Sequence, residues 1–200
     1  DIGKLYKQVK DLYNMHTDGK YIVLNDLDFT KSGSVFGSTF YGEIDFQGHK
    51  LILNVQGRSS YVIHTLGSGG VAKNVVIDQT IDNTSVRTYY YGFIYTNYGT
   101  VDNMIININE GATQFDNYVF TMGCYVNYGF IRNFVINSKS PVSARAATGI
   151  LMWSNEGVVE NGYVYGVNMN GNFESYDRDN KDIQEYAAKQ HNDNYQFGGK

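Results

Sequence analysis

Two pairs of carboxylates are the residues of this chain whose types and spacing best suit chemistry. Each pair alternates with apolar residues, in the stretches NDLDF and GEIDF. Because side chains of a strand alternate between two faces, the apolar residues should point inward and the carboxylates outward. Paired carboxylates can act as acid and base in glycosidic cleavage, or can hold calcium. The four candidates are Asp26, Asp28, Glu43 and Asp45.

A plainer interpretation of these carboxylates stays open, because a solvated strand face also requires polar residues. The two pairs lie 17 residues apart, which is less than one coil of the fold predicted below, so they need not stack. No cluster of Arg or Lys accompanies them, although a lyase acting on acidic sugars would need one. An acidic enzyme site and a solvated face are therefore alternatives at this stage.

Tyrosine supplies the second set of candidates, with 18 residues in a chain of 200. The stretch RTYYYGF places two tyrosines on one face of a strand and a third on the other. With tyrosines from later parts of the chain, they could form exposed rows that bind sugar rings or a protein partner. Stacking between neighbouring coils, which would support the sheet, is the alternative. The candidate binding residues are Tyr89, Tyr91, Tyr95, Tyr98, Tyr125 and Tyr128.

Motifs for other chemistry are absent from the sequence. None of the four histidines lies in H-E-x-x-H, and no G-x-S-x-G, C-x-x-C or P-loop occurs. His49 lies in a QGHK turn, where a structural role is expected. The single cysteine, Cys124, has no partner for an internal disulfide and is predicted to be a small buried apolar residue. We therefore expect no metal ligand, cofactor or catalytic nucleophile in this chain.

A repeat in the sequence predicts the strands that position these carboxylates and tyrosines. NYGTVDNMIININ at 97–109 returns as NYGFIRNFVINSK at 127–139 and as NEGVVENGYVYGV at 155–167. The shared pattern, G-x-x-x-N-x-x-[IV], has an earlier copy, and its asparagines are 29, 30 and 28 residues apart. Such a period, with alternating apolar residues and no helical pattern, predicts an all-β fold, a right-handed parallel β-helix.

Equivalent residues of successive coils should stack in this fold. We expect the glycines to supply corners with positive φ, the asparagines to be stacked corner residues as well, because Asn tolerates the left-handed region, and the aliphatic residues to form an interior ladder. The three columns are Gly70, Gly99, Gly129 and Gly157; Asn74, Asn103, Asn133 and Asn161; and Ile77, Ile106, Ile136 and Val164.

The chain is expected to divide into three parts. Apolar residues at a spacing of three to four over residues 2–15 predict an amphipathic helix, so residues 1–17 should cap the solenoid. Residues 18–173 should form about five to six coils, and residues 174–200 a C-terminal cap or linker. The chain opens on Asp1 and not on Met, so we expect it to be a fragment of a longer protein.

Charge and hydropathy narrow the range of partners. The formal net charge is −4, which disfavours nucleic acid because phosphate binding needs a basic face. No apolar run approaches the length of a membrane span. We therefore expect no nucleic-acid partner and no membrane span, and we expect a monomer.

The succession of strand and turn motifs resembles a known family. It is similar to the GLUG-type β-helix region of Gram-positive surface proteins. More narrowly, it is similar to the region before the catalytic domain of immunoglobulin-A-specific zinc metallopeptidases. The resemblance covers roughly residues 20–170. The residues that carry it are Tyr21, Val23, Asp26, Leu27 and Asp28, then Phe40, Gly42, Ile44, Asp45, Gly48 and His49.

This resemblance implies a non-catalytic scaffold or substrate-recognition domain of a secreted, cell-wall-attached zinc metalloendopeptidase. The zinc would lie in a catalytic domain C-terminal to this region, and the partner would be a host protein such as immunoglobulin A, or a glycan. The location would be extracellular or the bacterial cell surface. Two alternatives stay open, an adhesin-type binding repeat and a polysaccharide-degrading enzyme that uses the four carboxylates.

Overall fold

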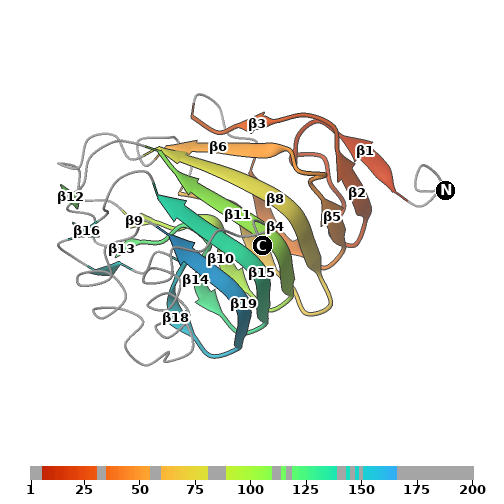
Figure 1. Cartoon of the computed structure of the whole chain (residues 1–200). Helices are drawn as coiled ribbons and strands as arrows, with labels where there is room; N and C mark the ends of the chain where they lie inside the picture. The colour runs from red at the N-terminus through yellow and green to blue at the C-terminus, as the bar shows by residue number, and fades with distance from the viewer. Residues whose placement is uncertain are drawn as a thin grey trace.

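The computed structural model describes most of the first 165 residues of the chain. The ranges are 6–30, 35–54, 60–80, 89–109, 114–115, 119–138, 143–144, 147–148 and 151–165. Within them every residue in regular secondary structure lies in a β-strand, and each strand pairing is parallel. Figure 1 shows β8, β11, β15 and β19 side by side in chain order. The predicted all-β parallel solenoid is confirmed.

The first face of the solenoid is a nine-stranded sheet in which the strands follow the order of the chain. Its main path runs through β1 (Lys7–Val9), β2 (Lys20–Val23), β5 (Glu43–Asp45), β8 (Val71–Thr80), β11 (Thr100–Ile108), β15 (Phe130–Ser138) and β19 (Val158–Tyr165). Off this path, β3 (Leu27–Asp28) pairs with β6 (Lys50–Asn54), which also pairs with β8.

The second face is a five-stranded sheet of β4 (Phe36–Phe40), β7 (Tyr61–Leu66), β10 (Gly92–Asn97), β14 (Cys124–Asn127) and β18 (Met152–Asn155). Two small sheets complete the coils. One contains β9 (Tyr89–Tyr90), β13 (Val119–Phe120) and β17 (Ala147–Thr148), and the other contains β12 (Gln114–Phe115) and β16 (Ser143–Ala144). Because each strand contacts its equivalent one coil away, side chains of one kind stack in columns.

The predicted interior ladder is present. Ile106 is registered with Ile77 on one side and Ile136 on the other, and all three are fully buried. Ile136 is registered in turn with Val164. Each buried side chain of this size contributes roughly 1.5–3 kcal/mol. Cys124 is a buried free cysteine, as predicted.

The asparagine column has the backbone conformation that was predicted. Asn74, Asn103, Asn133 and Asn161 have φ between 53° and 59°. The predicted corner position is wrong, because each lies inside a long strand, where one left-handed residue shifts the alternation of side chains. Ala72 and Val75 are therefore both buried, although they lie three residues apart. Asparagine suits this position because its side chain tolerates the left-handed region.

The glycine column has a different cause from the one predicted. The positive-φ glycines among the described residues are Gly48, Gly69 and Gly92, none of which belongs to the column. Instead, a Cβ at Gly129 would lie 2.1 Å from the carbonyl oxygen of Gly99. At Gly157 it would lie 2.2 Å from the Gly129 oxygen. The column is glycine because backbones of successive coils approach too closely for a side chain.

The N-terminal helix is not confirmed. Of residues 2–15, the structure describes 6–15, and this stretch contains β1 and no helix. β1 pairs with β2, with Val9 opposite Val23, while Tyr13 is exposed. Pairing with β2 gives the backbone N–H and C=O groups of β1 hydrogen-bond partners at the edge of the sheet. The three-to-four spacing of apolar residues carries no information about such a partner strand. The predicted C-terminal cap or linker, residues 174–200, lies outside the described residues.

Candidate functional site

Of the first carboxylate pair, Asp26 directly precedes β3 and Asp28 is its last residue. Asp26 Oδ1 accepts a hydrogen bond of 2.8 Å from the backbone N–H of Lys50 and lies 3.4 Å from His49 Nδ1. Asp28 Oδ1 accepts a hydrogen bond of 2.8 Å from the backbone N–H of Thr30. Both side chains are exposed, as the alternation predicted. The Asp28 bond is typical of turn formation by aspartate, whereas the Asp26 bond joins segments that are 24 residues apart in the chain.

The second pair, on β5, is half-buried and more heavily bonded. Glu43 accepts a 2.6 Å hydrogen bond from the Tyr6 hydroxyl and lies 2.7 Å from Lys73 Nζ. Asp45 Oδ1 accepts hydrogen bonds from the backbone N–H of Gln47 at 2.8 Å and from Asn74 Nδ2 at 3.0 Å. Both carboxylates therefore hold neighbouring strands and turns together.

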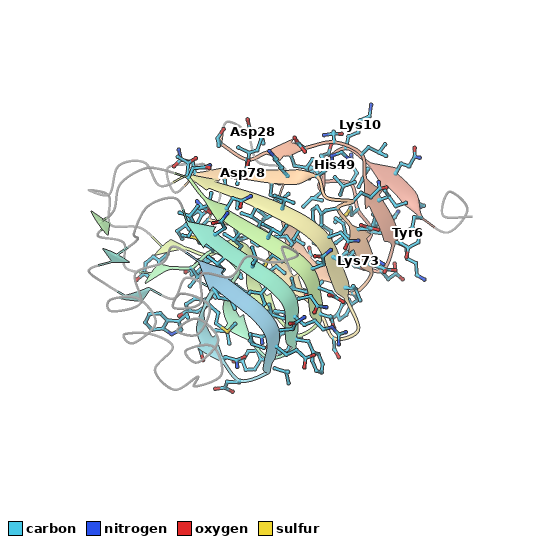
Figure 2. The ribbon with its side chains drawn as sticks, viewed as in Figure 1. Tyr6, Lys10, Asp28, His49, Lys73 and Asp78 are labelled. Carbon is cyan, nitrogen blue, oxygen red and sulfur yellow. The ribbon has the colours of Figure 1, made fainter. Side chains whose placement is uncertain are left out.

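The two pairs lie on different strands of one sheet, and one member of each binds the turn between β5 and β6: Asp45 accepts from the Gln47 N–H and Asp26 from the Lys50 N–H. β3 pairs with β6, whereas β5 lies between β2 and β8. In Figure 2, Asp28 lies at the top of the molecule, and Tyr6 and Lys73, which contact Glu43, lie on the right, about halfway down. A depression of about 170 Å³ beside β3 is lined by Asp26 and Asp28 but by neither carboxylate of β5.

The surroundings of Glu43 set its ionisation. Burial by itself would raise the pKa of Glu43, but the hydrogen bonds from Lys73 and Tyr6 outweigh burial and hold the pKa below its ordinary value. The hydrogen bond with Glu43 raises the pKa of Lys73 and the pKa of Tyr6. Glu43 is therefore held as a carboxylate, whereas a general acid would need a raised pKa.

Acid pH should weaken the fold through Glu43. Since its pKa is lower in the folded chain than in the unfolded chain, the unfolded state binds more protons as pH falls. The stability from Glu43 is present above the unfolded pKa and is lost as pH falls through the folded pKa. We expect Glu43→Gln to flatten the decline of the free energy of unfolding between about pH 6 and pH 3, measured by urea titration. Glu156→Gln, at an exposed carboxylate, is the control, and an unchanged slope in Glu43→Gln would contradict this assignment.

Two of the tyrosine candidates, Tyr95 and Tyr125, belong to a ladder of aromatic rings across the outer face of the second sheet. One aromatic side chain per coil follows the registered residues of β7, β10, β14 and β18. Ring centroids are 5.1 Å apart from His64 to Tyr95, 5.3 Å from Tyr95 to Tyr125, and 6.1 Å from Tyr125 to Trp153. The rings of Tyr95 and Tyr125 are nearly parallel, at 2°. We call His64, Tyr95, Tyr125 and Trp153 the aromatic ladder.

Two further tyrosines extend this ladder at its side. The Tyr91 ring meets Tyr95 and Tyr125 edge-on, at 4.7 and 5.0 Å, and Tyr89 stacks on Tyr91 at 6.5 Å. Burial is the main cause that raises the pKa of Tyr91 and of Tyr125. Both hydroxyls are therefore kept protonated.

The remaining two candidates lie apart from the ladder. Tyr98 and Tyr128 stack on each other at 5.0 Å and 9°, at the corners that lead into β11 and β15. Cross-coil stacking, one of the two alternatives, is therefore present in both groups. Exposure also occurs, because Tyr89, Tyr98 and Tyr128 are exposed.

Sequence reasoning missed His64 and Trp153 as members of the aromatic ladder. The signal was available, since the four positions are separated by 31, 30 and 28 residues, close to the period of the repeat. It was missed because the residue type changes along the column from His to Tyr to Trp. A search for aromatic rings of any kind at the repeat spacing would have found the column.

Within the described ranges, no group of three or more His, Cys, Asp or Glu could hold a metal ion. In those same ranges, no helix is long and apolar enough to span a bilayer. The chain matches no protein-family model, no curated protein and no solved structure.

Proposed function

We propose that this chain is a non-catalytic scaffold and substrate-recognition domain of a secreted protein attached to the cell wall. The observation that carries the proposal is the contrast between the two candidate sites. Each of the four carboxylates is already engaged in hydrogen bonds or an ion pair with turns and strands. Aromatic side chains, in contrast, cover several successive coils of the outer surface. Tyrosine and tryptophan are enriched at recognition surfaces because they combine large apolar area with a polar group.

The parent protein that we propose is a zinc metalloendopeptidase. Support comes from the resemblance of the strand and turn motifs between Tyr21 and His49 to the region before such a catalytic domain. Zinc would then be bound C-terminal to this region, and a host protein such as immunoglobulin A would be the substrate. We also propose that the solenoid is right-handed, because crossovers between parallel strands are nearly always right-handed.

The test compares this chain alone with the full-length protein. Both are incubated with human immunoglobulin A and with a panel of glycans, with and without a zinc chelator. We expect the full-length protein to cleave immunoglobulin A, the chelator to abolish cleavage, and the chain alone to bind without cleaving. A full-length protein that binds but cleaves nothing would favour an adhesin instead.

Glycan cleavage by the chain alone would contradict the proposal and favour a polysaccharide-degrading enzyme. Two double variants would then locate the activity, Asp26→Asn with Asp28→Asn, and Glu43→Gln with Asp45→Asn. If the proposal is right, glycan products are absent for the wild-type chain and for both double variants.

A further inference from the structure

We propose that the corner between the two sheets is a docking surface for a protein segment with an apolar stripe flanked by basic side chains. The surface, which we call the corner patch, consists of Tyr98, Tyr128, Phe130 and Val158. This inference rests on the proposed recognition function and assigns the contact to the corner patch instead of the aromatic ladder.

The side chains of the corner patch are more exposed to solvent than the tyrosines of the aromatic ladder. Its four side chains are 48%, 46%, 45% and 42% exposed. Phe130 and Val158 are registered on neighbouring strands, and Tyr98 stacks on Tyr128. In the ladder, by contrast, Tyr95 and Tyr125 are half-buried, each between two aromatic neighbours. A cluster of large apolar side chains in contact with water marks an interaction site more strongly than a covered one.

The composition of the patch favours a protein over a glycan. The Arg132 guanidinium carbon lies 5.8 Å from the centroid of the Phe130 ring, and Tyr98 and Tyr128 cover one face of each other. Arg132 and the neighbouring tyrosine therefore already cover much of the flat ring surface on which a sugar would stack. Tyrosine, phenylalanine and arginine together are the residues enriched in protein interfaces.

The rim of the patch is acidic. Asn127 and Asn155 are registered partners on neighbouring coils. Tyr128 and Glu156 are the next residues along the chain, so Glu156 lies beside Tyr128. Arg132 lies between Asp102, at 3.6 Å, and Glu160, at 3.9 Å. Two carboxylates therefore flank the guanidinium, and Glu156 adds a third negative charge beside Tyr128. A partner with lysine or arginine beside its apolar stripe would complement this rim, whereas an acidic partner would be repelled.

The probe is a synthetic amphipathic peptide of leucine and lysine with leucines at helical spacing. Its counterpart has glutamate in place of every lysine. Binding to the whole chain is measured by fluorescence anisotropy of the labelled peptides. We expect saturable binding of the lysine peptide, and binding of the glutamate peptide at least about fivefold weaker. Equal binding of the two peptides, or no binding of either, would overturn the proposal.

Variants locate the contact on the surface. Phe130→Ser and Glu156→Lys should each weaken binding of the lysine peptide by at least about fivefold, the loss typical of an interface anchor. Tyr13→Ser and Asp11→Lys change an exposed aromatic residue and an exposed carboxylate far along the chain, and should leave binding unchanged. If all four variants bind alike, the patch is not the site. Glu156→Lys keeps the test valid if Phe130→Ser fails to fold.

The outcomes separate this inference from the proposed function. Peptide binding at the patch, with no cleavage by the full-length protein, would keep the docking surface and remove the metallopeptidase parent. Chelator-sensitive cleavage by the full-length protein, with peptide binding indifferent to Phe130 and Glu156, would remove the docking surface alone.

Discussion

Replacing Gly129 with alanine should lower the free energy of unfolding by roughly 3 kcal/mol, at the upper end of the usual range for overpacking. The added Cβ would lie 2.1 Å from the Gly99 carbonyl oxygen and 2.7 Å from the Tyr98 carbonyl carbon. Both atoms belong to the backbone of the preceding coil, so no side-chain rotation can relieve the contact. The two coils must separate there, which would also lengthen the hydrogen bond from the Phe130 N–H to the Gly99 oxygen.

The measurement is urea unfolding followed by the fluorescence of Trp153, the single tryptophan of the chain. Gly37→Ala is the matched control, because the nearest atom to its Cβ would be the Tyr61 hydroxyl oxygen at 3.9 Å. We expect the control to stay within about 0.5 kcal/mol of the wild type. If Gly129→Ala were as stable as Gly37→Ala, close approach of the coils could not be the reason for glycine in this column.

Replacing Asn127 with leucine should also cost roughly 3 kcal/mol, because it leaves buried polar groups without partners. Asn127 is fully buried and accepts hydrogen bonds from Asn97 Nδ2 at 2.8 Å and from the Gly129 N–H at 3.2 Å. Its own Nδ2 donates to Asn155 Oδ1 at 2.8 Å. Leucine is similar in size but can make none of these bonds.

The control for this variant is Asn107→Leu. Asn107 is half-buried on β11, and its Nδ2 lies 3.5 Å from Asp78 Oδ1, so little hydrogen bonding is lost. The free energy of unfolding of Asn107→Leu should stay within about 0.5 kcal/mol of the wild type. Hydrogen–deuterium exchange gives a second readout, since the Gly129 amide should exchange faster in Asn127→Leu alone. Equal losses in the two variants would show that the buried asparagines add nothing beyond their volume.

The sequence pattern predicted some features of the fold and missed others, as particular residues show. The left-handed asparagines and the buried isoleucines were predicted because their causes are local, a backbone conformation in one case and a periodic apolar side chain in the other. The strand at Lys7–Val9 was not predicted, because a helix-like spacing of apolar residues gives no information about a neighbouring strand edge. The glycines were identified correctly as constrained, but for a wrong reason that only the adjacent coil explains.

By itself, the sequence determined the period of the solenoid and the columns along it, because a repeated local pattern forces equivalent residues into register. It also determined that the candidate carboxylates face outward, because alternation along a strand is a local property. Only the tertiary structure decided which strands and turns each carboxylate is bonded to, because that follows from the pairing of β3 with β6 and of β5 with β2 and β8. It also decided which tyrosines are covered and which are exposed, because exposure depends on the side chains that the neighbouring coils bring beside each ring.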